Sequence, residues 1–169
     1  MRGTRAFVFV TAALAAAVAV GTGAAADGGT ARGWGVELTL PDGWAKVQPA
    51  SQTWSTDPRT MLVIGTDGVR AAESDCQVSA YHVPSDGAVV VVIGWREAVG
   101  VSGFLPLSNL KLRRGTFSCF DGRGAVAQVT RRGLDYQVNV MVGDRASADT
   151  VAAALDAARS ISAAPRHRD

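Results

Sequence analysis

The chain has 169 residues, close to half of them hydrophobic, with 17 basic and 15 acidic side chains. This length suits one domain with a sizeable core. Arg2 and Arg5 lie in an N-terminal segment that we expect to be removed, which leaves 15 charges of each sign. A net charge of zero gives no electrostatic reason to expect nucleic acid or anionic lipid as a partner.

The first 26 residues have the order of a secretory signal peptide: basic Met1–Arg5, apolar Ala6–Val20, and small residues ending at Ala26. The apolar run has 15 residues, whereas a membrane span needs roughly 20. We therefore predict a signal peptide over 1–26 and a secreted or cell-envelope location. If this segment were retained, it would act as an anchor, and we expect membrane contact only in that case.

The next segments predict strands and turns. Residues 27–33 have no periodicity, which predicts a flexible leader. Trp34–Leu40 alternates apolar and polar residues, as a half-buried strand does. After the turn Pro41–Gly43, Trp44–Val47 predicts a second strand that completes a hairpin. Met61–Gly65 predicts a compact apolar strand.

Stronger strand patterns follow in the second half. Ala88–Trp95 contains five consecutive β-branched residues, which is typical of a central strand covered on both faces. Ala125–Thr130 and Leu134–Val142 predict a hairpin with Gly133 near its tip. Gln77–Val83 fits either a strand or a short helix.

The C-terminal part predicts one amphipathic helix. Ser147 can cap it, and an apolar stripe repeats at helical spacing through Val151, Ala154, Leu155, Ala158 and Ile161. Residues 163–169 read as a polar tail. Several strands followed by a helix predict a single α+β domain over 34–162, mainly antiparallel sheet with the helix packed on one face.

Cys76 and Cys119 are the only cysteines, and both follow the predicted cleavage site. Oxidising compartments allow such a pair to close, so we predict a structural disulfide. It would enclose about 44 residues and contribute roughly 4 kcal/mol on the chain-entropy model. The alternative is a free redox pair, which the absence of a C-x-x-C spacing disfavours.

Residues suited to catalysis are few. His82 is the only histidine outside the tail, and a general base needs a nucleophile and an orienting carboxylate close by. We expect His82 to be structural or exposed. The spacing of histidines, cysteines and carboxylates matches no metal site, and we expect neither a metal nor a cofactor.

Arginines gather at predicted turns and strand ends. If these ends meet on one sheet edge, the guanidinium groups could recognise a carboxylate or phosphate. The alternative is that they keep hairpin tips solvated and blunt the sheet edges. The arginines concerned are Arg113, Arg114, Arg131 and Arg132, with Arg123 between them.

The chain has four tryptophans. Where their large rings are exposed, they could anchor a protein partner or stack on a sugar ring. Trp34 follows the strand alternation and Trp95 ends the most apolar strand, so we expect both in the core. Trp54 lies in a polar loop and is the tryptophan that we expect to contact a partner.

Several of these features together resemble a known group. They are Leu40–Trp44, Asp57–Pro58 ahead of a strand, the two cysteines, and the closing strand and helix that end at Ile161. In these residues the chain resembles small exported actinobacterial proteins, a group from which no activity or site residue carries over. The opening strand with its Pro-x-Gly-Trp turn is also similar to PsbP/Mog1-like domains, a likeness that implies a sheet and a helix but no function.

Export, one predicted disulfide and no catalytic motif favour a non-enzymatic domain that binds a protein or small-molecule partner at the cell envelope or outside the cell. The loops 52–59 and 96–112 would carry recognition, because loops on a rigid sheet usually do. Two alternatives stay open: an envelope-tethered accessory domain, and a small secreted hydrolase built around His82.

Overall fold

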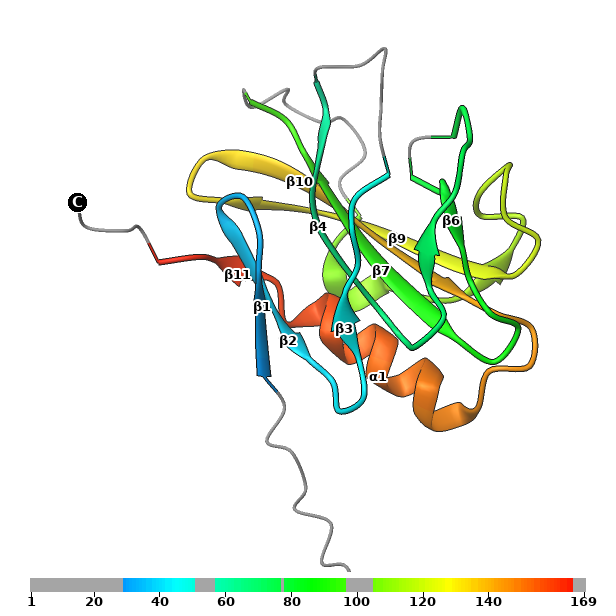
Figure 1. Ribbon diagram of the computed structural model, residues 1–169. Helices are drawn as coiled ribbons and strands as arrows, with labels where there is room; N and C mark the ends of the chain where they lie inside the picture. Colours follow the sequence, from blue (N-terminus) through cyan, green and yellow to red (C-terminus); the bar gives the residue numbers. More distant parts are fainter. Residues whose placement is uncertain (1–28, 51–56, 77, 97–104, 166–169) are drawn as a thin grey trace, which may run out of the picture.

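The computed structural model of the chain describes residues 29–50, 57–76, 78–96 and 105–165. In this part of the chain, antiparallel strands form three sheets, and one α-helix, α1 (Ala148–Arg159), packs against the largest of them (Figure 1). The fold is therefore mainly antiparallel α+β, as the sequence predicts. The predicted signal peptide, residues 1–26, lies outside the described residues.

The central sheet has six antiparallel strands, and its middle strand is wholly buried. All seven residues of that strand, β7 (Ala88–Gly94), are buried, since both of its faces are covered. The prediction of a central strand here is confirmed. The order across the sheet is β3 (Ala45–Lys46), β4 (Arg59–Gly65), β7 (Ala88–Gly94), β10 (Leu134–Val142), β9 (Arg123–Arg131) and β8 (Arg113–Arg114).

Strands β9 and β10 form the predicted hairpin. Arg131 lies opposite Leu134, so the turn between them consists of Arg132 and Gly133. Both turn residues are left-handed, with φ of 51° and 76°. A two-residue turn with positive φ at both positions matches the right-handed twist of the strands it joins.

A smaller sheet joins the beginning and the end of the described chain. Its order is β1 (Gly29–Arg32), β2 (Val36–Leu40) and β11 (Ser162–Ala163). Residues 29–32 therefore form a strand, and the prediction of a flexible leader is wrong for them. Ala31 is the only buried residue of β1, and one apolar residue gives no periodicity to detect. Ala163, the first residue of the predicted tail, likewise belongs to a strand.

The predicted opening hairpin is wrong in its pairing. Strand β3 pairs with β4, with Ala45 opposite Gly65 and Lys46 opposite Ile64. The turn after Leu40 carries the chain from the small sheet to the central sheet, so β2 pairs with β1 and β11 instead.

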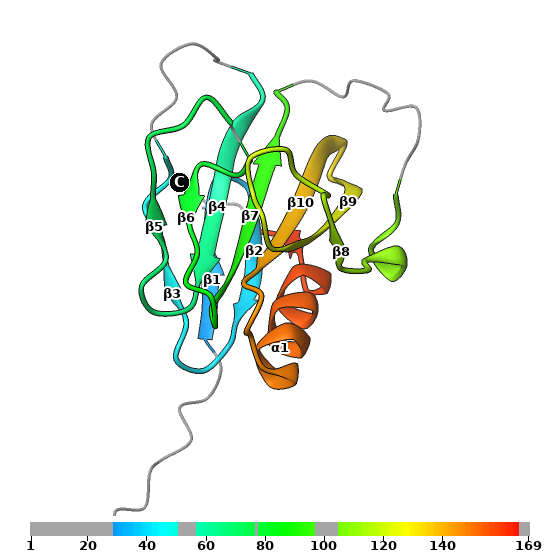
Figure 2. The ribbon, with the colours of Figure 1, turned by 90° about the vertical axis from the view of Figure 1, so that its right-hand side faces the viewer.

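Helix α1 covers one face of the central sheet (Figure 2). Ser147 caps it, because its Oγ accepts a hydrogen bond of 3.0 Å from the Thr150 N–H. The helix buries its alanines Ala154, Ala157 and Ala158, and such small side chains let its axis approach the sheet closely. No helix in the described part is long and apolar enough to cross a membrane.

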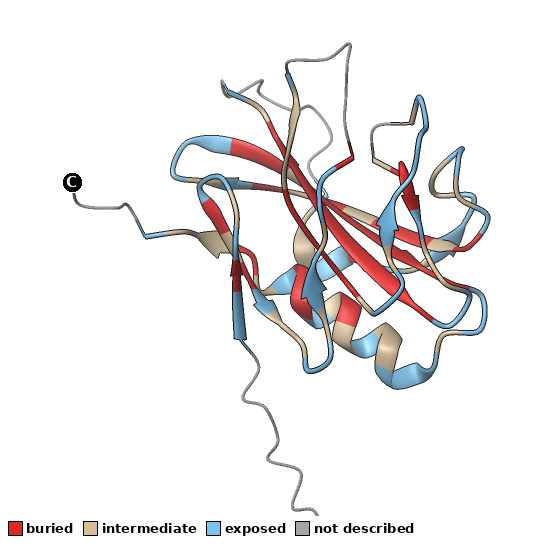
Figure 3. Ribbon diagram, in the orientation of Figure 1, coloured by how far each residue is buried: buried red, intermediate tan, exposed pale blue. Residues whose placement is uncertain are grey.

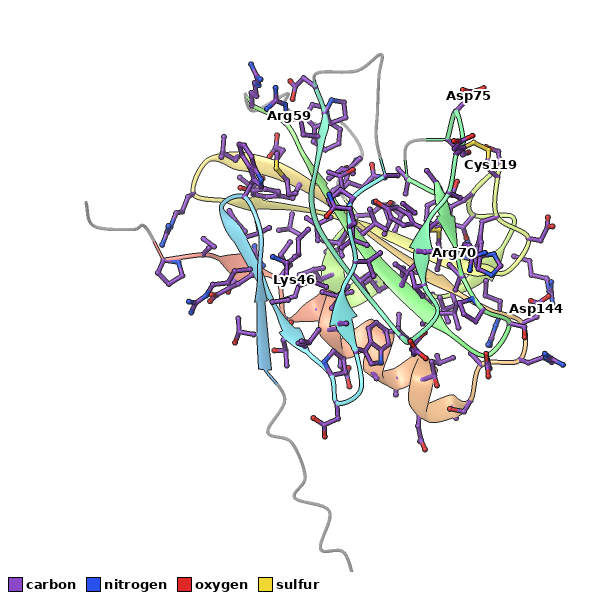
Figure 4. The ribbon with its side chains drawn as sticks, in the orientation of Figure 1. Lys46, Arg59, Arg70, Asp75, Cys119 and Asp144 are labelled. Atoms are coloured by element: carbon purple, nitrogen blue, oxygen red, sulfur yellow. A yellow bond between two sulfur atoms is a disulfide. The ribbon has the colours of Figure 1, made fainter. Side chains whose placement is uncertain are left out.

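The other face of the sheet is covered by a two-stranded ribbon, β5 (Arg70–Ala71) and β6 (Tyr81–His82), together with Phe117 and Phe120. The buried residues of β4, β7 and β10 form the centre of the molecule (Figure 3). The predicted disulfide is present: Cys76 and Cys119 are bonded, with their Cα atoms 6.3 Å apart. Figure 4 shows this bond beside the ribbon.

Candidate functional site

Strand β8 is an edge strand of the central sheet, and its pairing with β9 is short. Arg113 lies opposite Gly124 and Arg114 opposite Arg123, and the ladder covers these two pairs alone. The preceding chain forms a 3₁₀ turn, η1 (Leu107–Asn109), that lies against β9. Between η1 and β8, the edge of strand β9 is therefore left partly uncovered.

The uncovered edge borders a groove of about 550 Å³, which we call the basic groove. That volume lies within the range of roughly 300–1,000 Å³ typical of small-ligand sites. Near the groove, the N–H of Gln128 on β9 donates a 2.7 Å hydrogen bond to the carbonyl of Leu105. The lining residues are Leu105, Asn109, Lys111, Arg113, Arg114, Gly115, Thr116, Ala125 and Val126.

Positive charge dominates the lining. Lys111, Arg113 and Arg114 are all exposed, and no carboxylate lines the groove among the residues that the structure describes. The Arg114 guanidinium pairs with the Asp144 carboxylate at 2.9 Å. The side chains of Lys111 and Arg113 make no hydrogen bond or ion pair with the residues that the structure describes. Both side chains line the same groove.

The two predicted arginine pairs do not meet. Arg131 and Arg132 lie at the other end of β9 from Arg123, eight residues away, or about 26 Å along a strand. They bond the C-terminal segment instead: Arg131 Nε donates to the Ile161 carbonyl at 3.3 Å, and Arg132 Nη1 donates to the Ala164 carbonyl at 2.6 Å. Their role here is to hold β11 in place.

The tryptophans are also distributed differently from the prediction. Trp54 lies outside the described residues. Trp95 is half-buried and packs against the hydrophobic core on the face of the central sheet that the β5–β6 ribbon covers. Trp34, expected in the core, is 73% exposed. It lies in the turn between β1 and β2, next to Gly35 with a φ of 74°. The flanking glycines Gly33 and Gly35 were the sequence signal for a turn at this position.

His82 is exposed and borders a shallow hollow of about 340 Å³ that Ser85 and Asp144 also line. A hydrolytic triad requires hydrogen bonds from nucleophile to base and from base to carboxylate. Ser85 Oγ instead accepts a 2.7 Å bond from Arg145, and Asp144 pairs with Arg114. No hydrogen bond joins either residue to His82 in the described chain, so this arrangement does not form a relay.

Across the described residues, no three histidine, cysteine or acidic side chains are grouped so as to hold a metal ion. Comparisons with protein-family models, curated proteins and solved structures find no match to this chain. The resemblance to small exported actinobacterial proteins and to PsbP/Mog1-like domains stays a prediction, and function has to be argued from the surface itself.

Proposed function

We propose that this protein is an exported, non-enzymatic binding domain that engages an anionic partner through the basic groove, at the cell envelope or outside the cell. The observation that carries the proposal is the lining of three cationic side chains, Lys111, Arg113 and Arg114, with no carboxylate among the described lining residues. Ammonium and guanidinium groups at such positions recognise carboxylate or phosphate groups.

The arrangement of charges distinguishes the groove from an ordinary solvated edge. Asp144 holds the Arg114 guanidinium in one orientation, while Lys111 and Arg113 keep their donors free of described partners. The chain after residue 26 has equal numbers of basic and acidic side chains. Unbalanced cations in one groove are therefore a local feature, which supports recognition of a discrete anionic group over a general attraction to polyanions.

Export is supported by two features. The first 26 residues have the order of a signal peptide, and Cys76 and Cys119 are joined in a disulfide, a bond that persists in oxidising compartments. The mass of the protein recovered from its host separates this proposal from the tethered alternative. A chain starting at Asp27 fits export with cleavage, whereas a chain starting at Met1 fits an anchor.

Charge reversal in the groove tests the binding proposal. Poly-L-glutamate and inorganic polyphosphate serve as carboxylate and phosphate probes, and calorimetry measures their affinity. We expect at least one probe to bind and Arg113→Glu to weaken that binding at least about tenfold, because a hydrogen bond to a charged group contributes roughly 1.5–3 kcal/mol. A lower melting temperature of the Arg113→Glu variant would instead indicate that the substitution impairs folding.

Arg70→Glu is the matched control. Arg70 is exposed on β5 (Figure 4), outside the lining of the groove. The substitution therefore makes the same change of charge as Arg113→Glu, but on the ribbon. We expect this variant to bind as the unmodified protein does. An equal loss in both variants would indicate unspecific attraction, and absence of binding to either probe would reject an anionic partner.

A further inference from the structure

Trp34 is the most exposed large hydrophobic residue of the described chain, at 73%, ahead of Leu105 at 43% and Leu134 at 37%. It belongs to neither of the two hydrophobic core clusters, one between the central sheet and α1 and the other between the sheet and the β5–β6 ribbon. A single exposed apolar side chain needs no explanation by itself. The argument therefore depends on how Trp34 is held and on what lies beside it.

The backbone at Trp34 is fixed against the central sheet. The Trp34 N–H donates to the Met61 carbonyl at 3.3 Å, and the Gly33 N–H donates to the Val36 carbonyl at 3.0 Å. A Cβ on Gly33 would lie 2.1 Å from the Met61 carbonyl oxygen, so the tip of the β1–β2 hairpin touches β4 directly (Figure 1). An aromatic ring on a fixed backbone loses less conformational entropy on binding.

A hollow of about 320 Å³ adjoins Trp34, between the hairpin tip and the end of β3. Polar groups border it. Lys46 Nζ donates one hydrogen bond to the Arg32 carbonyl at 2.7 Å and has further donors to offer. The Gln48 side chain is exposed and makes no hydrogen bond that the described residues supply. The remaining lining residues are Gly33, Val47, Pro49 and Thr60–Val63.

The backbone edge beside Trp34 is already occupied. The Met61 carbonyl accepts from Trp34, and the Val63 carbonyl accepts from the Val47 N–H at 3.0 Å. An extended peptide that added a strand would need such groups free. At β4 a ligand would therefore be recognised by side chains, and those bordering the hollow offer a flat indole face, an amide and an ammonium.

We infer that Trp34 and this hollow bind a neutral sugar ring of an oligosaccharide. The C–H face of a pyranose ring would stack on the indole, and its hydroxyl groups would exchange hydrogen bonds with Gln48 and Lys46. Among its described lining residues there is no carboxylate, and the one cation, Lys46, already donates to the Arg32 carbonyl. A neutral polyhydroxylated ring suits that lining better than an ion or an aliphatic chain.

Soluble hexasaccharides test this inference on the full-length chain as recovered from its host. The probes are cellohexaose, chitohexaose and maltohexaose, followed by saturation-transfer NMR and calorimetry. We expect at least one to bind and Trp34→Ala to weaken binding about tenfold, with Trp34→Phe retaining part of the affinity because it keeps an aromatic face. Since Trp34 contacts neither core cluster, the melting temperature of the Ala variant should be unchanged.

Leu134→Ala is the control for loss of exposed apolar surface outside the lining of the hollow, and Arg113→Glu is the control for the basic groove. Both should bind the hexasaccharide normally. Binding that is insensitive to Trp34→Ala, or no binding of any of the three probes, would overturn the inference. So would capture of a proline-rich peptide at Trp34 with no sugar bound.

Discussion

At Gly33 the β1–β2 hairpin meets strand β4, and no side chain fits between them. A Cβ at this position would lie 2.1 Å from the Met61 carbonyl oxygen and 2.8 Å from the Leu62 Cβ. Gly33→Ala must therefore push the hairpin away from the sheet. We expect the free energy of unfolding to fall by about 1–3 kcal/mol, as for overpacked cores, measured by urea denaturation.

Gly29→Ala provides the comparison within the same strand, β1. The nearest atom to a Cβ there is 3.9 Å away, on Leu40. Because alanine restricts the unfolded chain more than glycine does, this variant should be neutral or slightly more stable. Equal destabilisation by the two substitutions would contradict the steric explanation for Gly33.

Tyr81 makes stability depend on alkaline pH. Burial raises the pKa of its hydroxyl above the ordinary value of about 10, although the Ala50 N–H donates to it at 3.2 Å and opposes the rise. In the unfolded chain the phenol ionises near pH 10, whereas in the folded protein it stays protonated. The contribution to stability is therefore complete below about pH 10 and is lost as the pH rises through the folded pKa.

We expect the urea midpoint to be level from pH 8 to about 9.5 and to fall above pH 10. Tyr81→Phe should reduce the alkaline slope, even though it loses the bond to Ala50. Burial also raises the pKa of Tyr136, so Tyr136→Phe should reduce the slope as well. A slope identical in both variants and in the unmodified protein would show that other groups control it.

Among the elements, the β5–β6 ribbon is joined to the segment 117–120 by the disulfide. Cys76 precedes β6, and Cys119 lies between Phe117 and Phe120, which pack on the same face of the sheet. The bond closes a loop of about 44 residues, which on the chain-entropy model corresponds to roughly 4 kcal/mol. Cys76→Ser with Cys119→Ser should lower the free energy of unfolding by about that amount in urea.

Reductant provides an internal check on this variant. It should destabilise the unmodified protein to the level of the double variant and leave the double variant unchanged. An unmodified protein whose urea midpoint is insensitive to reductant, although both thiols become titratable, would show that the ribbon holds its place without the bond.

Elements that could be predicted are those with their own sequence pattern. Strand β7 has five consecutive β-branched residues, the β9–β10 hairpin has a glycine at its turn, and α1 has both a cap and an apolar stripe. The elements that could not be predicted are short strands with distant partners. β11 has two residues and pairs with β2 through Ser162 and Glu37, a contact that no local periodicity signals.

The candidate site could be predicted only in part, because it also depends on how distant segments come together. Arg113 and Arg114 lie on an exposed edge strand, but the sequence cannot say at which end of a long strand one turn lies relative to another. The hypothesis that Arg131 and Arg132 meet them on one sheet edge is therefore wrong. Lys111 and Trp34 were missed, because their importance comes from a gap in the sheet and from a turn that packs on β4.

At the scale of the whole molecule, the two proposed surfaces lie at opposite edges of the central sheet. Strand β8 ends the strand order on one side, and β3 and β4 end it on the other. Four strand spacings separate β4 from β8, or about 19 Å. A ligand in the basic groove would therefore leave the hollow at Trp34 accessible, and the protein could hold an anionic group and a sugar at the same time.

The small sheet also sets an order of events during synthesis. Strand β2 needs β11 as its neighbour, and Ser162 lies 125 residues after Glu37. At about 5–20 residues per second, roughly 6–25 s pass between the synthesis of these two strands. If the first 26 residues act as the export signal that we predict, the signal leaves the ribosome while the domain still lacks its closing strand. The newly made chain would thus reach the export machinery before it can complete its fold.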